Sequence, residues 1–151
     1  MQSLALVSTA ADLHRLMRTV SCIGGHTQIE RVLELAVRET KGAKVNALIF
    51  VGDAMEEKVD QLCHLAGQLG SLGVPVFVFH ESNDPIAASA FKQVASMSRG
   101  AYVPFDLAGI DRLKELLGAV AVYATGNRAA LEAYGQRKGG EVLRLTAQLK
   151  Q

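Results

Sequence analysis

The stretch VNALIFV, residues 45–51, sets the fold class of this chain. It is short, largely apolar and rich in β-branched and aromatic side chains, which is typical of a buried strand. Two further runs share this character, VPVFVF at 74–79 and AYVPF at 101–105. Runs that are apolar on both faces suit a parallel sheet with helices on each side. We therefore expect three buried parallel strands.

The segments between these runs have the pattern of amphipathic helices. Their apolar residues are spaced three and four positions apart, which places them on one face of a helix. The alternation of helices and strands predicts an α/β protein with three layers, α/β/α, and an open, mostly parallel sheet with right-handed crossovers. The inward-facing residues expected on these helices are Ile29, Val32, Leu33, Ala36 and Val37; Val59, Leu62, Cys63, Ala66 and Leu69; Ala90, Phe91, Val94 and Ala95; and Leu113, Leu116, Leu117 and Val120.

A first helix is expected over residues 10–19, with Leu13, Leu16 and Met17 facing inward. Glycine frequently ends a helix, because the residue after the last turn often takes a left-handed conformation. Several glycines precede the expected strands and fit this role. They are Gly70, Gly73 and Gly100.

The two ends of the chain give weaker patterns. Residues 3–8 are compatible with one more strand, and RAALEAYGQ at 128–136 predicts a helix. The segment EVLRLTAQL at 141–149 fits a strand or a helix equally well. We therefore divide the chain into an α/β domain over 1–125 and a C-terminal extension over 126–151.

Composition narrows the class of partner and the compartment. The chain has 151 residues, enough for one domain, and its 16 Lys and Arg nearly balance 15 Asp and Glu. This balance, with 5% aromatic residues and no Trp, argues against nucleic acid as a partner. No apolar run is long enough to span a membrane and no secretory signal is present, so we expect a cytoplasmic protein. Cys22 and Cys63 form neither a disulfide framework nor a metal-binding spacing.

The best functional clue combines a glycine-containing loop with a strand-end carboxylate. Asp53 directly follows the strand at 45–51, and the loop Gly24-Gly25-His26-Thr27 precedes the helix that leads into that strand. Open α/β sheets bind ligands at the carboxyl ends of their strands, and both features are expected at that edge. A hydroxyl from Thr27 and a carboxylate from Asp53 are oxygen ligands that suit Mg²⁺ or Mn²⁺.

Each of these residues also has a purely structural interpretation. Thr27 with Glu30 forms the pattern of a capping box, in which the threonine caps its own helix. Asp53 with Glu56 has the same spacing, so Asp53 fits the N-cap of the following helix. A cap does not require two glycines before it, whereas a loop that approaches a ligand often uses them.

A second candidate at the same edge is His80-Glu81, which follows the strand at 74–79. Together with Asp53, this histidine offers acid–base chemistry and hence a small hydrolase-like enzyme as an alternative function. The structural interpretation is that His80 is a solvated loop residue and Asp84 caps the next helix. No set of nucleophile, base and orienting residue occurs in the sequence, so we do not expect an enzyme.

Four segments together resemble the von Willebrand factor A (vWA) domain in its bacterial cytoplasmic form. They are GGHTQIERVLELAV at 24–37, ALIFVGDAMEE at 47–57, GVPVFVFHE at 73–81 and the Gly100-Ala101-Tyr102 helix end. The resemblance implies a Rossmann-like sheet and a module that binds other proteins. It also implies a divalent-cation site, the metal ion-dependent adhesion site (MIDAS), in which Thr27 and Asp53 match two of the family ligands.

The chain departs from the family at one decisive place. The Asp-x-Ser-x-Ser loop, which follows the family's first and central strand, occurs nowhere in the sequence. The resemblance therefore implies a vWA domain truncated at its N-terminus, which lacks the family's first strands and begins near the third. Only a partial, MIDAS-like site is expected, with weak or absent binding of Mg²⁺ or Mn²⁺ by this chain alone.

The same departure predicts an uncovered sheet edge at Val45–Val51, which invites pairing with another chain. We expect a homodimer or a swapped assembly that covers this edge. The functional expectation is a protein-binding module of vWA type with an unidentified protein partner, contacted through Thr27, Asp53, Gly24, Gly25 and His26, with His80 and Glu81 alongside. The other alternative is an inactive fragment of a longer vWA protein.

Overall fold

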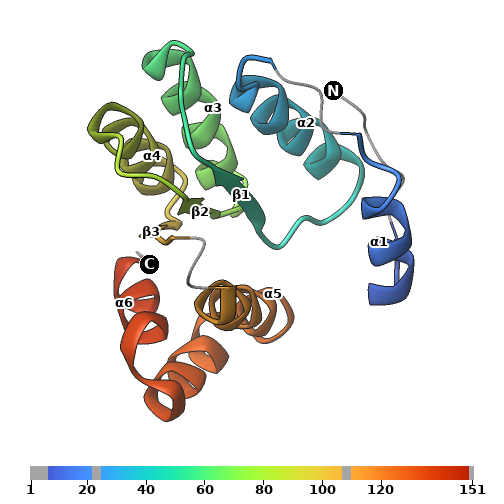
Figure 1. Ribbon diagram of the computed structural model, residues 1–151. Coiled ribbons are helices and arrows are strands. Elements are labelled where there is room, and N and C mark those ends of the chain that lie inside the picture. Colours follow the sequence, from blue (N-terminus) through green and yellow to red (C-terminus); the bar gives the residue numbers. More distant parts are fainter. Residues whose placement is uncertain (1–6, 22–24, 107–109, 150–151) are drawn as a thin grey trace.

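The computed structural model describes residues 7–21, 25–106 and 110–149 of the chain. Its sheet has three strands, all parallel, in the order β1-β2-β3. Figure 1 shows the sheet at the centre of the molecule, with helices above and below it. The three apolar runs of the sequence are thereby confirmed as neighbouring strands. They are β1 (Leu48–Gly52), β2 (Val76–His80) and β3 (Ala101–Pro104).

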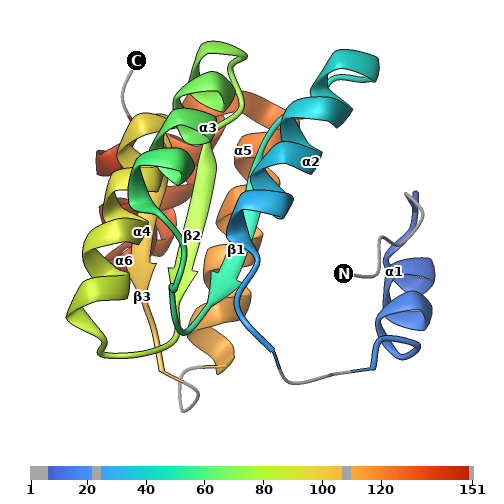
Figure 2. The same cartoon turned by 90° about the horizontal axis from the view of Figure 1, so that it is seen from above.

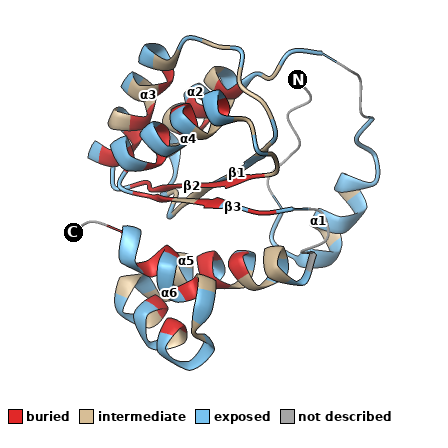
Figure 3. Ribbon diagram, turned by 60° about the vertical axis from the view of Figure 1, so that its left-hand side comes forward, coloured by how far each residue is buried: buried red, intermediate tan, exposed pale blue. Residues whose placement is uncertain are grey.

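Helices cover both faces of the sheet, as expected from the alternating pattern. Helices α2, α3 and α4 lie on one face, and α5 and α6 lie on the other (Figures 1 and 3). The α/β class and the layered, parallel arrangement are confirmed. The helices are α1 (Ala10–Met17), α2 (Ile29–Gly42), α3 (Val59–Ser71), α4 (Pro85–Met97), α5 (Ile110–Lys138) and α6 (Gly140–Gln148).

Strand β2 divides the apolar core into two parts, because successive side chains of a strand point to opposite faces. Val76 and Val78 pack with α2, α3 and α4, around residues such as Leu33. Phe77 and Phe79 pack with α5 and α6 on the other side. Every residue of β2 is buried, and Figure 3 shows this strand in red between the two helical layers. The central position of β2 explains why its sequence is apolar on both faces.

Helix α1 differs from the expectation. Its predicted inward residues Leu13 and Met17 are exposed, and no residue of α1 is buried. In Figures 1 and 2 the helix stands apart from the sheet, on the side of β1. The spacing predicted the helix correctly. It was wrong about burial, because amphipathic spacing cannot show whether the rest of the fold supplies a surface to pack against.

The glycines before the strands serve different purposes. Gly73 has a φ of 75° and follows α3, as predicted. At the end of α4 the left-handed position is held by Arg99, with a φ of 60°, and not by Gly100. Gly100 instead permits close approach to β2, since a Cβ there would lie 2.0 Å from the Val76 carbonyl oxygen. Gly70 lies inside α3, where a Cβ would meet the Met97 carbonyl oxygen at 2.6 Å.

The C-terminal segment is helical. Helix α5 runs through residues 128–136 with a kink at Asn127, whose side chain accepts hydrogen bonds from the next turn. Residues 141–149, which fitted a strand or a helix, belong largely to α6. Leu131 and Leu145 join the core on the Phe77 side. The boundary at residue 125 stays a prediction, and most of the candidate strand at 3–8 lies outside the described residues.

Candidate functional site

The carboxyl edge of the sheet brings the ends of β1 and β2 together. Their register pairs Gly52 with His80, so Asp53 and Glu81 leave the sheet side by side. The Glu81 amide donates a hydrogen bond to the Gly52 carbonyl at 3.0 Å. Figure 2 shows all three strands pointing toward this edge, where the chain also enters α2. The described site residues therefore lie at one edge of the sheet, with His80 at the end of β2 and the others in loops.

His80 is completely buried at the end of β2, so its interpretation as a solvated loop residue was wrong. Its ring lies edge-on to Phe91, with the ring centres 4.9 Å apart. Nδ1 lies 2.9 Å from the Tyr102 hydroxyl, and Nε2 lies 3.2 Å from the Asp53 carbonyl oxygen. Burial also raises the pKa of the Tyr102 hydroxyl above its ordinary value. This histidine links all three strands from inside the protein.

Ser82, which sequence reasoning missed, completes this network. Its hydroxyl lies 2.8 Å from the Asp53 carbonyl oxygen and 2.8 Å from His80 Nε2. Because a carbonyl oxygen only accepts, the hydroxyl donates to Asp53, and Nε2 carries the hydrogen that points toward Ser82 and Asp53. Nδ1 then accepts from Tyr102. A nucleophilic serine needs the reverse arrangement, in which histidine accepts the serine proton.

The only sequence signal for Ser82 was its place two residues before a helix cap. The Asp84 amide donates to the Ser82 hydroxyl at 3.1 Å, and the Asp84 carboxylate accepts from the Ile86 amide at 2.8 Å. Asp84 therefore caps α4, with Pro85 in its first turn, as the structural interpretation expected. The turn holds Ser82 against Asp53.

Asp53 is fixed through its backbone, whereas its side chain points away from the network. The side chain is exposed, and among the described residues the carboxylate accepts no hydrogen bond and forms no ion pair. The interpretation of Asp53 as an N-cap is wrong, because α3 begins at Val59 with Lys58 in the cap position. Because this carboxylate neither caps a helix nor pairs with another described side chain, it is available to a ligand.

Helix α2 is capped from a distance. The Glu57 carboxylate accepts hydrogen bonds from the Ile29 amide at 2.6 Å and the Glu30 amide at 3.0 Å. The N-cap residue is Gln28, with no side-chain cap of its own, so the predicted capping box of Thr27 and Glu30 is wrong. A negative group here also suits the positive end of the helix dipole. No local pattern reveals this contact, because it joins residues 28 positions apart.

The described residues of the predicted loop differ in exposure, with Gly25 and His26 exposed. Thr27 is half-buried, and its hydroxyl has no hydrogen-bond partner within the described residues. His26 Nδ1 lies 2.6 Å from Glu56 Oε2 in a pair with 89% and 51% of the two side chains exposed, so the pair contributes little to stability. Gly25 has open space around it, Glu81 is half-buried, and Gly24 lies outside the described residues.

A divalent cation needs more ligands than these residues offer. Mg²⁺ favours octahedral coordination by oxygen. Thr27 provides a hydroxyl and Asp53 a carboxylate, but nowhere in the described ranges do three or more His, Cys, Asp or Glu side chains gather to hold a metal ion. The described residues therefore do not fit a complete metal site.

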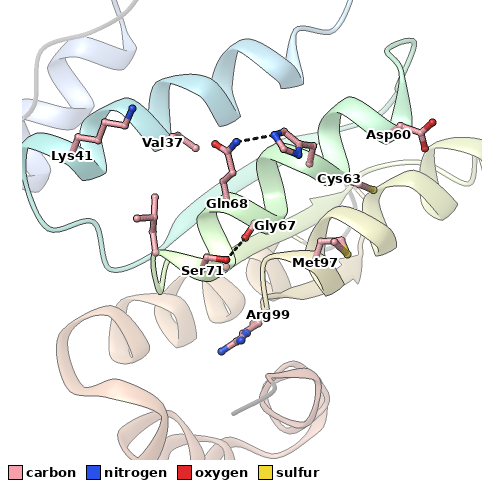
Figure 4. Close-up of a pocket in the computed structure, with 12 residues that line it drawn as sticks. Val37, Lys41, Asp60, Cys63, Gly67, Gln68, Ser71, Met97 and Arg99 are labelled. Atoms are coloured by element: carbon pink, nitrogen blue, oxygen red, sulfur yellow. Dashed lines mark hydrogen bonds between the residues drawn. The ribbon is translucent and has the colours of Figure 1, made fainter.

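A broad hollow of about 940 Å³ lies over α3, between α2 and the end of α4 (Figure 4). Gly67, Cys63 and Met97 line it together with the cationic side chains of Lys41 and Arg99. Its lining includes none of the predicted site residues that the structure describes. Burial, and to a smaller extent the Asp60 carboxylate, raise the pKa of the Cys63 thiol. A raised pKa disfavours the thiolate, so Cys63 is expected to be a weaker nucleophile than an ordinary cysteine.

Comparison with known proteins does not identify the chain. No protein-family model, no curated protein and no solved structure matches it. In the part of the chain that the structure describes, no helix is long and apolar enough to cross a membrane. The vWA resemblance therefore stays a prediction that rests on the residues themselves.

Proposed function

We propose that this chain is a protein-binding module of vWA type, which contacts its partner with the carboxyl edge of the sheet around Asp53 and Thr27. One observation carries the proposal. Asp53 has its backbone held by His80 and Ser82 while its carboxylate is exposed and unpaired among the described residues. The nearly balanced charge and the low aromatic content favour a protein over a nucleic acid as the partner.

The arrangement supports binding because it limits the entropy lost on association. The Asp53 carbonyl accepts from the Ser82 hydroxyl at 2.8 Å and faces the buried His80 ring, which fixes the start of the loop. Groups that are held in place before binding cost less to order in a complex. Thr27 lies just before α2, whose first amides are fixed by Glu57. Both candidate residues thus adjoin anchored backbone.

The same contacts argue against the hydrolase alternative. His80 faces the backbone carbonyl of Asp53, not its carboxylate, and the ring is fully buried. The hydrogen of Nε2 points toward Ser82, so this histidine does not act as a base for that hydroxyl in the observed arrangement. The network therefore supports a structural role for His80.

A cation fits this proposal only as a shared ligand. Thr27 and Asp53 would supply two of the oxygens for Mg²⁺ or Mn²⁺, and a carboxylate from the partner, with water, would supply the others. Binding of the ion by this chain alone is expected to be weak.

Comparative capture tests this function. The tagged chain and three variants, Asp53→Asn, Thr27→Val and Asp111→Asn, are used to enrich proteins from an extract of the source organism containing millimolar Mg²⁺. Asp111 is the control carboxylate, because its side chain is 99% exposed in the first turn of α5, on the opposite side of the sheet from α2 (Figure 1). Thermal melting of each variant first establishes that it folds.

We expect at least one protein to be enriched by the wild-type chain and the Asp111 variant, and to fall at least tenfold with the Asp53 variant. A smaller loss is expected with Thr27→Val. Equal enrichment by the Asp53 and Asp111 variants, or no specific enrichment by any of them, would contradict a partner-binding role for this edge.

A further inference from the structure

The two outer strands of the sheet differ in whether another part of the fold pairs with their outer edges. At β3, the Gln148 side chain of α6 imitates a neighbouring strand: its Oε1 accepts from the Tyr102 amide at 2.8 Å and its Nε2 donates to the Tyr102 carbonyl at 3.0 Å. At β1, no strand or side chain in the described ranges pairs with the outer edge. Within the described residues, the outer edge of β3 is therefore paired, whereas the outer edge of β1 is not.

The outward-pointing backbone groups of β1 belong to Ile49 and Val51. The Leu48 amide donates to Pro75 and the Gly52 carbonyl accepts from Glu81, so these residues face β2. In a parallel strand, the residues between such partners direct their amide and carbonyl groups to the opposite side. Ile49 and Val51 consequently offer unpaired donors and acceptors at the edge.

The same two residues also expose apolar side chains. Ile49 is 39% exposed and Val51 is 48% exposed. The register places them opposite Phe77 and Phe79, on the sheet face that carries α5 and α6. The unpaired backbone groups and the exposed apolar side chains of these two residues thus form one continuous strip along β1.

This edge has none of the usual protection against pairing. Exposed edge strands commonly carry a charge, a proline or a covering element. Residues 45–52, VNALIFVG, contain no charged residue and no proline. Figure 2 shows α1 standing clear of β1, and no residue of α1 is buried.

We propose that β1 pairs with β1 of a second copy of this chain, antiparallel, about a two-fold axis at Phe50. In this register Ile49 lies opposite Val51 of the partner subunit, and each such pair exchanges both of its backbone hydrogen bonds. Phe50 directs its backbone groups to β2, so it occupies the non-hydrogen-bonded position at the axis. The apolar side chains of the two copies form one strip, and the two sheets become continuous.

The charges at the two ends of β1 select a second copy in this orientation. Lys44 precedes the strand, whereas Asp53, Glu56 and Glu57 follow it. Antiparallel pairing brings Lys44 to the acidic end of the partner strand, and parallel pairing would place Lys44 beside its own copy. Each strand therefore carries both a basic end and an acidic end, and the two-fold axis brings opposite charges together at both ends of the paired strands. Because one strand from each copy gives a small interface, we expect micromolar affinity.

Sedimentation over a range of concentrations tests the pairing. The variants are Ile49→Lys, which places a charge on the edge, and Ile86→Lys, a matched control at a residue that is 71% exposed on α4. We expect a dimer for the wild type and the control, and a monomer with an unchanged circular dichroism spectrum for Ile49→Lys. A wild-type chain that stays monomeric at millimolar concentration would overturn the proposal, as would a dimer that survives Ile49→Lys.

Zero-length carbodiimide crosslinking tests the orientation without any substitution. Equal amounts of ¹⁵N-labelled and unlabelled chain are mixed, so that mixed-isotope peptides identify crosslinks between copies. We expect Lys44 to be joined to Asp53 or Glu56 of the partner subunit. A dimer without these crosslinks, in which an amine-specific reagent joins Lys44 to Lys44, would show parallel pairing and overturn the register. Neither experiment depends on the partner proposed for Asp53.

Discussion

The Nε2 atom of His80 lies 3.2 Å from the backbone carbonyl oxygen of Asp53, which ties the end of β2 to the chain that leaves β1. The contact is made inside the protein, since His80 has no exposed surface. It fixes the backbone of Asp53, whose carboxylate has no partner among the described residues. A histidine that looked like a catalytic candidate thus positions the backbone of the residue that we propose contacts the partner.

Replacing His80 by Leu is expected to lower the free energy of unfolding by about 1–3 kcal/mol, because buried polar partners lose their hydrogen bonds. The groups concerned are the Tyr102 hydroxyl and the Asp53 carbonyl. Urea unfolding measures the change. His64→Leu is the control, because His64 is exposed on α3 and bonds only to Gln68 in the same helix. Equal stability of the two variants would refute the anchoring role.

The cap of α2 by Glu57 predicts a contrast between two adjacent glutamates. Glu57→Gln is expected to cost about 1 kcal/mol of unfolding free energy, because a charged acceptor is replaced by a neutral one at a helix N-terminus. Glu56→Gln is expected to cost close to nothing, since Glu56 pairs with His26 on the surface. Hydrogen exchange at the Ile29 and Glu30 amides should quicken in the first variant only. A larger loss with Glu56→Gln would exclude the cap.

Gly100 and Gly73 require glycine for two different reasons, close packing at Gly100 and a left-handed backbone conformation at Gly73. Gly100→Ala is expected to destabilise by about 3 kcal/mol or more, since the new Cβ would lie 2.0 Å from the Val76 carbonyl oxygen at the start of the central strand β2. Gly73→Ala is expected to cost about 1–2 kcal/mol, because only its left-handed backbone conformation is disfavoured. Thermal unfolding of both variants provides the comparison. The opposite order would mean that α4 and β2 do not approach as closely as described.

Cys63 should react slowly. Its thiol pKa is raised by burial and by Asp60, so less thiolate is present at neutral pH than for an ordinary cysteine. In a Cys22→Ser variant, alkylation of Cys63 is expected to be slower in the folded chain than in urea, and to keep rising at a pH where the unfolded thiol has levelled off. Rates measured with iodoacetamide from pH 7 to 10 give both profiles. Faster reaction in the folded chain would indicate an activated thiol.

The layers of the fold were predictable because burial leaves a periodic trace in the sequence. The apolar runs around Val76–Phe79 and the spacing of Ile29, Leu33 and Ala36 gave the strands and helices correctly. The same logic was wrong for the burial of Leu13 and Met17, because spacing records which residues share a face and not what covers that face.

The carboxyl edge was also predictable, whereas its hydrogen bonds were not. An aspartate at the end of a strand must emerge at this edge, which made the position of Asp53 predictable. A helix that leads into the strand must begin at the same edge, which made the position of Thr27 predictable. The contacts of Glu57 with Ile29 and of Ser82 with Asp53 join segments far apart in sequence. Such contacts depend on register and loop geometry, which no local pattern specifies.

The most direct test of the proposed half-site uses Mn²⁺ as the cation and acetate as a stand-in for the partner's carboxylate. Amide signals of the ¹⁵N-labelled chain are followed while Mn²⁺ is added, with and without acetate, for the wild type, Asp53→Asn and Asp111→Asn. The account predicts paramagnetic broadening centred on residues 25–30 and 53–57, stronger with acetate, lost with Asp53→Asn and kept with Asp111→Asn. Broadening that is the same in both variants, or that acetate does not strengthen, would contradict it.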